Sequence, residues 1–524
     1  MDLSLRVFFN FIVYMLTQKL KSILGIVILL NLTASAFAQD RNANAVDFEK
    51  ELIQIQSGIW DNPAMLGHQY NKSFTDVSLA WKQRKANGLY RIETGNKTSS
   101  IDFDAYSFKR REKNFVFGRA SYSKNNMDNI KWNTVSDYSE LAPYIVADTI
   151  GGKTYGENYS FEGIYSLIQK KSTYALQAKY RSSEDYRKLD PRPKSTVSDL
   201  EIKLGGTREI NSKYMIGLYA GYHDYQQDHE VDALRPGTGI KVFYLRGLGI
   251  SDENFSTVVT NSGGVGNIYE KKGYSLGTQL IPIGQTGWYQ SFSYKKSKLE
   301  LLKIVGTGYD IVNDLDAKEF QFTLGKQYQF TNKIFKINSF ASYQSKTGSD
   351  YNYNYNRQLL SVIEKYSAKY LDGGFTSILL VRGIKHSSLY QMEIKYSSDE
   401  SEYKIANSKN PKQEVEHVTL RLNTGRNFQF SKSSLNIKLE ALAQYCINSD
   451  LTTSSLAKGK ANESLIVPNY EYLKSDWLSL ASNIRYDFDT KNTYGIYTKL
   501  AYQYMIIENS KSQYSFNFAI GLTL

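Results

Sequence analysis

Alternation of apolar and polar residues with a period of two is the feature that most constrains this chain. In the last eleven residues, small or polar side chains separate an apolar set made up of Tyr514, Phe516, Phe518, Ile520, Leu522 and Leu524. A period of two places the two sets on opposite faces of an extended strand. The C-terminal residues are therefore predicted to form a β-strand with one apolar side.

The same alternation recurs from residue 74 to the last residue. The clearest stretches are residues 77–81, 174–180, 214–222, 390–396, 435–445, 478–488 and 494–504. Proline, which cannot donate a hydrogen bond to a ladder, accounts for only 8 of the 524 residues. No repeat of fixed period accompanies the alternation, which argues against a propeller or a solenoid. Most of the chain is therefore predicted to be β-sheet.

The composition of these stretches favours a transmembrane antiparallel β-barrel of the all-β class. The chain contains 42 Tyr and 25 Phe, residue types that suit strands and membrane interfaces. Apolar residues facing lipid and polar residues facing a lumen would produce the observed alternation. A soluble β-sandwich is the alternative, but the alternating stretches are longer than the strands usual in such folds. We expect about 14 strands, between roughly 12 and 16, over residues 74–524.

The first 38 residues have the features of a secretory signal peptide. Lys19 and Lys21 precede an apolar run at residues 23–30, and Ala36-Phe37-Ala38 follows as a cleavage site. An uncleaved helical anchor is the alternative, although the apolar core is shorter than the roughly 20 residues that span a bilayer. We expect export to the cell outer membrane of a Gram-negative bacterium.

Three segments divide the chain in this interpretation. Residues 1–38 form the signal peptide, with initiation expected at Met15, residues 39–73 form an N-terminal segment, and residues 74–524 form the barrel. Long polar stretches inside the barrel region are predicted to be extracellular loops, because the periplasmic turns of such barrels are normally short. These stretches cover residues 124–158, 226–272, 345–372 and 448–475.

A short motif near the mature N-terminus resembles that of a known family. Asn62-Pro63-Ala64, followed by Gly67, is similar to the N-terminal NPA segment of the long-chain fatty-acid transporter family and of related outer-membrane barrels from Bacteroidota. The resemblance implies a 14-stranded barrel with a small hatch inside its lumen, and a hydrophobic ligand. Asn-Pro also starts ordinary turns, so a turn before the first strand is the alternative.

The C-terminal strand resembles the strand by which barrel precursors are recognised for insertion. Many such strands end in Phe, whereas this one ends in Leu524. As a whole, the chain resembles uncharacterised outer-membrane barrel families of Bacteroidota. The partners expected from these resemblances are outer-membrane lipid, the barrel assembly machinery, and an outer-membrane receptor or lipoprotein.

Charge and cysteine content exclude other classes. The formal charge of +12 comes from Lys and Arg scattered along the whole chain, which argues against a nucleic-acid partner. The one cysteine, Cys446, cannot form an intramolecular disulfide or a cysteine-based zinc cluster.

Catalytic and metal-binding motifs are weak in this sequence. His223-Asp224 and Asp228-His229 match no familiar spacing of metal ligands. His386-Ser387 and Glu416-His417 have no recognisable third partner for nucleophilic catalysis. We therefore expect no enzyme, no metal and no cofactor.

A passage protein is the function that this interpretation favours. Its lumen would be lined by residues such as His223, Lys499 and Gln503, and it would carry a small solute or a hydrophobic ligand. A non-enzymatic binding or scaffold barrel within a larger outer-membrane complex is the alternative, based on the long aromatic loops.

Overall fold

A computed structural model describes residues 60–70, 72–234, 239–260, 264–283, 286–383, 385–457, 459–489, 494–508 and 511–523. The predicted signal peptide, initiation at Met15, residues 39–59 and Leu524 lie outside these ranges. The first barrel strand begins at Phe74 and the last described strand ends at Thr523.

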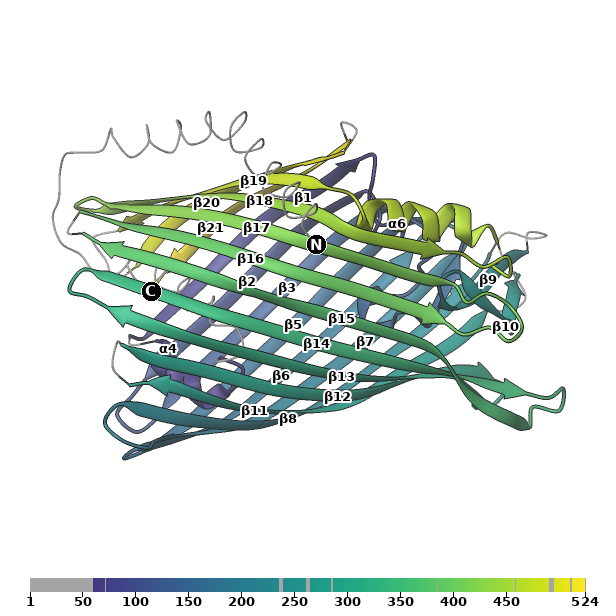
Figure 1. Cartoon of the computed structure of the whole chain (residues 1–524), viewed down its shortest axis with the longest axis horizontal. Helices are drawn as coiled ribbons and strands as arrows, with labels where there is room; N and C mark the ends of the chain where they lie inside the picture. The colour runs from purple at the N-terminus through teal and green to yellow at the C-terminus, as the bar shows by residue number, and fades with distance from the viewer. Residues whose placement is uncertain are drawn as a thin grey trace, which may run out of the picture.

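Eighteen antiparallel strands form one closed barrel (Figure 1). Each barrel strand pairs with the next barrel strand along the chain. Two insertions, one between β3 and β5 and one between β8 and β11, interrupt the order without entering the barrel sheet. The sheet closes where β21 pairs with β1, with Trp81 opposite Phe518. The strands are β1 (Phe74–Asn87), β2 (Lys97–Arg110), β3 (Phe115–Ile130), β5 (Gly152–Gln169), β6 (Ser172–Arg187), β7 (Arg192–Glu209), β8 (Tyr214–Asp232), β11 (Val265–Pro282), β12 (Gly287–Val305), β13 (Gly308–Gln329), β14 (Lys333–Tyr353), β15 (Leu359–Arg382), β16 (His386–Tyr403), β17 (Lys412–Gln429), β18 (Ser433–Thr452), β19 (Trp477–Asp489), β20 (Gly495–Ile507) and β21 (Lys511–Thr523).

The all-β barrel class is confirmed, but the predicted number of about 14 strands (12 to 16) is wrong, because the barrel has 18. The prediction treated the long polar stretches as loops, and part of this polar sequence belongs to strands. Residues 345–372 form a continuous hairpin instead, in which β14 and β15 pair as far as Tyr353 and Leu359. Where a strand extends beyond the hydrocarbon layer, backbone hydrogen bonds to its neighbours hold it and its outer face can be polar. Such a stretch shows no alternation of apolar and polar residues in the sequence, so the alternation does not predict it.

Alternation along each strand separates a lipid-facing surface from the lumen. In β8, Leu218 is 60% exposed on the outer face, whereas Tyr219 and Tyr225 are buried on the inner face. In β21 the outer face carries the predicted apolar residues, of which Phe518, Ile520 and Leu522 are exposed. A closed antiparallel barrel with an apolar outside leaves no unpaired strand edge in the bilayer, and it is the architecture of outer-membrane proteins. The chain is therefore an outer-membrane barrel.

The two ends of the barrel differ in their connections. One end, here the short-turn end, carries brief turns such as residues 170–171 and 330–332. The other, here the lid end, carries the long connections 131–151, 233–264 and 453–476. Because periplasmic turns are normally short in this class, the short-turn end faces the periplasm.

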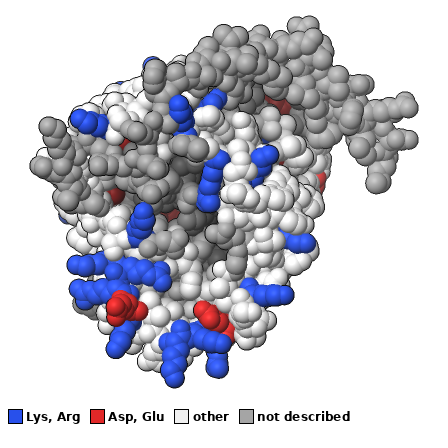
Figure 2. Space-filling view, turned by 90° about the vertical axis from the view of Figure 1, so that its left-hand side faces the viewer, with Lys and Arg blue, Asp and Glu red and all other residues white. Residues whose placement is uncertain are grey.

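Positive charge gathers at the short-turn end, as the view onto that end shows (Figure 2). Among the described residues, five acidic ones lie in its turns or no more than three residues from a strand end: Asp76, Glu112, Glu209, Asp487 and Asp489. Sixteen described basic residues lie in the same turns and strand ends: Lys72, Lys109, Arg110, Arg111, Lys113, Lys170, Lys171, Arg208, Lys213, Lys326, Lys333, Lys336, Arg382, Lys385, Arg426 and Lys432. The basic excess that is scattered in the sequence is therefore concentrated at one rim of the structure.

The connections at the lid end contain a second sheet and short helices. The sheet is three-stranded, with β4 (Ile145–Asp148) and β10 (Ile250–Val259) on either side of β9 (Ile240–Gly247). The helical segments are η1 (Pro63–Met65), α4 (Leu66–Gln69), η2 (Ile92–Thr94), α5 (Tyr138–Leu141), η3 (Asn462–Ile466) and α6 (Val467–Leu473), of which η1 and α4 precede the barrel. Within the described ranges, no helix is both long and apolar enough to cross a membrane.

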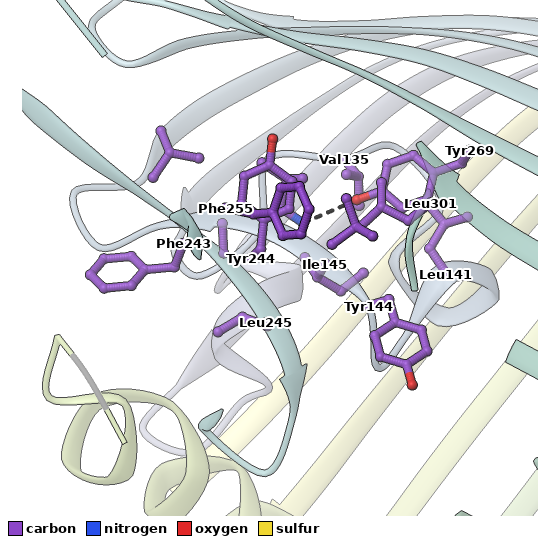
Figure 3. Packing of buried hydrophobic residues seen from close by; sticks show 14 of the residues in the cluster. Val135, Leu141, Tyr144, Ile145, Phe243, Tyr244, Leu245, Phe255, Tyr269 and Leu301 are labelled. Carbon is purple, nitrogen blue, oxygen red and sulfur yellow. Dashed lines mark hydrogen bonds between the residues drawn. The ribbon is translucent and has the colours of Figure 1, made fainter. Parts of the chain in front are cut away.

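The largest apolar core joins these connections to the inner wall of the barrel (Figure 3). Tyr144 and Tyr244 from the connections are almost completely buried, together with Tyr269 from β11. Val231 and Leu301 extend the core along the wall strands β8 and β12. Burial of such large side chains makes the connections part of the folded barrel.

Candidate functional site

The three long connections pack on one another and form what we call the lid, defined as the described parts of residues 131–151, 233–264 and 453–476. β4 pairs with β9, which joins the first connection to the second. The Trp132 indole N–H donates to Ser464 Oγ at 3.0 Å, which joins the first connection to the third. The lid is therefore one unit built from segments that are far apart in the sequence.

A buried ion pair attaches the lid to the barrel wall. Arg187 Nη1 at the end of β6 lies 2.7 Å from Asp148 Oδ2 at the end of β4, and the two side chains are 2% and 0% exposed. The Val146 backbone N–H donates to the Tyr269 hydroxyl at 3.0 Å (Figure 3). Polar groups buried this deeply need such partners, which ties the position of β4 to β6 and β11.

A second buried cluster attaches β9 to another part of the wall. Arg246 Nη1 lies 3.1 Å from Asp350 Oδ2 on β14. Asn313 Nδ2 donates to the other oxygen of Asp350 at 2.8 Å, and the Tyr403 hydroxyl also donates to that carboxylate. The lid is thus held by buried charged contacts to β6 and to β14.

A chamber of about 650 Å³ lies in the lumen beside α5. Polar and charged side chains make up most of its wall. They include Asp137, Ser139 and Glu140 from the lid, and Lys179, Arg181, Asp199, Glu201, His223, Lys271, Lys295, Glu319, Gln344 and Lys346 from the strands. Leu299, Leu315 and Ala317 are the apolar contributors on the inner face. The chamber is therefore a polar compartment with charges of both signs.

Arg181 is the centre of the largest charged network in the chamber. Its two terminal nitrogens donate to the two carboxylate oxygens of Asp137 at 3.1 and 2.7 Å. Its Nε and Nη2 also donate to Asp199 at 3.1 and 3.0 Å. His223 Nε2 lies 2.7 Å from the other oxygen of Asp199, and the Tyr225 hydroxyl donates to Asp137. These bonds fix the start of α5 against β6, β7 and β8.

Glu140 makes the second charged contact between α5 and the wall. Lys271 Nζ on β11 lies 2.6 Å from Glu140 Oε2. Burial acts to raise the pKa of the Glu140 carboxyl, but the charge and hydrogen bond of Lys271, together with the nearby Lys346 and His223, hold that pKa below its usual value. Glu140 is therefore ionised at neutral pH.

The three lumen residues predicted from the sequence do not come together. His223 lines the chamber and binds Asp199. Gln503 lies on the inner face of β20, where its Nε2 donates to Ser479 Oγ at 2.8 Å, and Lys499 lies four residues earlier on the same face of the strand. Sequence reasoning missed Arg181 and Asp199, although each occupies the polar face of an alternating stretch. It also missed Asp137, because no local pattern indicates that its loop folds inward.

The Asn62-Pro63-Ala64 motif lies inside the barrel, against the wall near the short-turn end. Asn62 Oδ1 accepts from the Ala64 N–H at 3.0 Å and so begins the helical turn η1. Asn62 Nδ2 donates to the Leu218 carbonyl at 3.1 Å and to Gln279 Oε1 at 3.1 Å. The motif therefore joins the N-terminal segment to β8 and β11.

Two glycines make room for this contact. A Cβ at Gly205 would lie 2.1 Å from Asn62 Oδ1, and one at Gly217 would lie 2.4 Å from Met65 Cε. Gly67 of the motif itself faces Phe115, whose Cε1 would lie 2.6 Å from a Cβ at this position. Glycine is thus required on both the segment and the wall.

The remaining candidate groups do not converge on a reactive centre. His223 and His229 lie on the inner face of β8, whereas Asp224 and Asp228 lie on the alternate face. No cluster of three metal-ligating side chains occurs among the described residues. His417 Nε2 contacts the Leu473 carbonyl at 2.7 Å, which supports α6.

Comparisons with known proteins give a family and a set of distant folds. The family described as "Family of unknown function (DUF6850)" matches residues 63–524. No curated protein matches the chain. The family match begins within η1 and extends through every strand of the barrel.

Solved structures with related folds share little sequence with the chain. The ferric preacinetobactin receptor BauA from Acinetobacter baumannii has a TM-score of 0.44 and 11% identity, over 87% of this chain and 80% of that chain. The outer membrane transporter YddB from Escherichia coli has a TM-score of 0.38 and 7% identity, over 87% and 81% of the two chains. The monoaromatic hydrocarbon channel CymD has a TM-score of 0.31 and 10% identity, over 89% and 91%.

Proposed function

The chain belongs to the DUF6850 family of unknown function, and we propose that it forms a gated passage for a small polar solute across the outer membrane. The observation that carries the proposal is the charged chamber of about 650 Å³ beside α5, inside a closed barrel and beneath an inward-folded lid. The interior of a barrel that serves only as a scaffold can be filled by packed side chains, which leaves no compartment of this size.

The lining of the chamber supports a polar solute over a hydrophobic one. The fatty-acid transporter resemblance implies a hydrophobic ligand, but the inner wall here is mostly charged or hydrogen-bonding. Transfer of an apolar chain into such a compartment would displace water from charges without replacing its hydrogen bonds. The 14 strands implied by the resemblance also differ from the 18 of this barrel. A hatch role for residues 60–70 is a separate proposal, supported by the contacts of Asn62 with the inner wall.

Two chamber lysines have no carboxylate partner in the described part of the chain, although the Lys346 ammonium lies 5.7 Å from the ring centre of Tyr370. Among the described residues, no carboxylate oxygen lies within 4.0 Å of the ammonium of Lys179 or Lys346, whereas Arg181 and Lys271 have acidic partners. An ammonium group without a carboxylate partner attracts the acidic group of an incoming molecule. We therefore expect the passage to favour solutes that carry a carboxylate or phosphate over cationic ones.

The lid supplies the gate in this proposal. It rests on the chamber through α5 and is attached by side chains, so it can move without breaking the strand ladder of the barrel. Lids and inward loops that limit access to a lumen are a common use of long connections on a rigid scaffold.

Conductance across a planar bilayer tests the proposal. We compare the mature protein with a variant in which residues 239–260 are replaced by a short Gly-Ser linker, which removes β9 and β10. The linker variant should conduct more than the wild type, and Lys179→Glu with Lys346→Glu in that background should lower the anion-to-cation permeability ratio. Lys499→Glu, on the β20 wall away from the chamber, is the matched control. A folded linker variant that carries no current would refute the passage function.

A further inference from the structure

A groove runs along the lipid-facing surface of the barrel in its periplasmic half. Its volume is about 810 Å³, and its outer lining is apolar, with Tyr174, Leu176, Leu204, Leu218 and Leu276 among the wall residues. Leu204 and Leu218 are 62% and 60% exposed, so no part of the described chain covers them. A hollow of this kind in a lipid-facing wall is filled by hydrocarbon chains.

The floor of the groove is set by Gly206, which pairs with Tyr174 on β6 and Leu218 on β8. A side chain would fit there, because the nearest atom to a Cβ at Gly206 is Tyr174 Cδ1 at 3.6 Å. The missing side chain at this position therefore deepens the groove, together with the small side chains of Ala220 and Thr278, and a larger residue would fill it without disturbing the backbone.

Two basic residues lie at the periplasmic rim beyond the end of the groove. Arg208 follows Gly206 by two residues on the same outer face of β7, roughly 7 Å further along the strand. Lys171 lies in the adjacent β5–β6 turn at the same rim, where its carbonyl accepts from the Glu209 N–H at 2.9 Å and the next residue, Ser172, lies opposite Arg208. Glu209 itself alternates to the inner face. Within the described part of the chain, neither Arg208 nor Lys171 forms a salt bridge.

Lys326 shows, at another point on this rim, how a basic residue lies beside aromatic rings at the membrane interface. Lys326 Nζ lies 5.1 Å from the ring centre of Trp288 and 4.8 Å from that of Tyr328. Trp288 is lipid-facing and 49% exposed. Aromatic rings of this kind occupy the level of the headgroups, so cations beside them face lipid phosphates. Arg208 and Lys171 stand at the corresponding turn-proximal level of β7 and of the β5–β6 turn.

We propose that the groove and its basic rim form a binding site for an anionic phospholipid of the periplasmic leaflet. An acyl chain lies over Gly206 between Leu204 and Leu218, and the headgroup phosphate is bound by Arg208 and Lys171. The planar guanidinium of Arg208 suits two phosphate oxygens, whereas Lys171 contributes a point charge. The site lies outside the lumen, so it is independent of the passage function.

Lipid retention by the purified protein tests this site. The full mature chain is extracted into micelles that contain equal amounts of phosphatidylglycerol and phosphatidylcholine, and bound lipids are counted by native mass spectrometry. The wild type should retain phosphatidylglycerol in preference. Arg208→Gln should lower that preference about fivefold, the effect of one charge near an anionic surface. Gly206→Trp should lower the retention of both lipids, because the indole fills the acyl groove.

Lys432→Gln provides the matched control, since Lys432 is an exposed basic residue at the same rim, in the turn between β17 and β18. It should leave the ratio of bound lipids unchanged. Equal retention of the two lipids by the wild type would overturn the proposal. The same result is expected if an acidic protein segment, and not a lipid, binds the basic rim. An identical ratio for Arg208→Gln and Lys432→Gln would overturn it as well. Heat-dependent mobility on gels confirms that each variant is folded.

Discussion

Replacement of Asp148 by Asn should release the lid while the barrel stays intact. Asp148 Oδ2 lies 2.7 Å from Arg187 Nη1, and the side chains are 0% and 2% exposed. The amide is nearly the same size and can still accept from the Gly151 N–H, as Asp148 Oδ1 does at 2.5 Å. Only the negative charge is lost, so the Arg187 guanidinium is left buried without a counter-charge.

The size of the effect follows from that burial. Removal of one partner of a buried pair costs about 3–5 kcal/mol, because the remaining charge has neither water nor a counter-ion. Arg187 belongs to the wall and regains water when β4 moves away, so lid opening relieves the cost. At about 1.4 kcal/mol per factor of ten, the open-to-closed ratio should rise between roughly a hundredfold and a few thousandfold.

Hydrogen exchange on the refolded protein measures this shift. Amides of β4 and of Trp132, whose N–H donates to the Asp148 carbonyl at 2.9 Å, should exchange faster in the variant. Wall strands such as β7 should keep their protection. Lys124→Gln removes an exposed pair with Glu157 and should change neither set. Adding Arg187→Gln to Asp148→Asn should restore part of the protection. Unchanged exchange in β4 for a folded Asp148→Asn protein would refute the argument.

Three further predictions concern the N-terminal segment, α5 and the lipid-facing surface. Gly205→Leu should displace residues 60–70 from the wall, since a Cβ there would lie 2.1 Å from Asn62 Oδ1, and limited proteolysis should then cut this segment first. The folded pKa of Glu140 is lowered, so its ionised carboxylate stabilises the lid above the usual pKa of 4.5, and this stabilisation is lost as the pH falls through the lower folded pKa. Hydrogen exchange of the lid should therefore depend on acid pH in the wild type, and this dependence should be absent in Glu140→Gln. Leu500→Lys, on the outer face of β20, should cost about 2–4 kcal/mol of unfolding free energy in lipid vesicles, whereas Ala501→Lys on the inner face should cost clearly less; equal costs would contradict the assigned sidedness.

Local patterns predicted the sidedness of the wall but not the number of strands. Leu218 and His223 lie on the faces that the alternation indicates, because a strand turns successive side chains to opposite sides whatever its neighbours are. The hairpin at residues 345–372 was missed, because strand ends beyond the membrane are held by pairing with the adjacent strand. Pairing of this kind leaves no signal of period two.

The chamber depended on contacts that no local pattern contains. Asp137 and Arg181 are separated by 44 residues, and Asp350 and Arg246 by 104, yet each pair meets inside the lumen. Which loop folds inward is decided by the apolar surface that it can bury, as Tyr144 and Tyr244 do against the wall. The basic rim was likewise invisible in the sequence, because antiparallel pairing gathers turns from the whole chain at one end of the barrel.

The sequence by itself thus determined that the chain makes two-sided strands with an apolar lipid face, because that information lies in each residue and its nearest neighbours. Only the tertiary structure decided that eighteen strands close the barrel, that three loops form a lid, and that ionic side chains surround a chamber. These features arise from packing and pairing between distant residues, whose energies depend on which partners the closed sheet brings together.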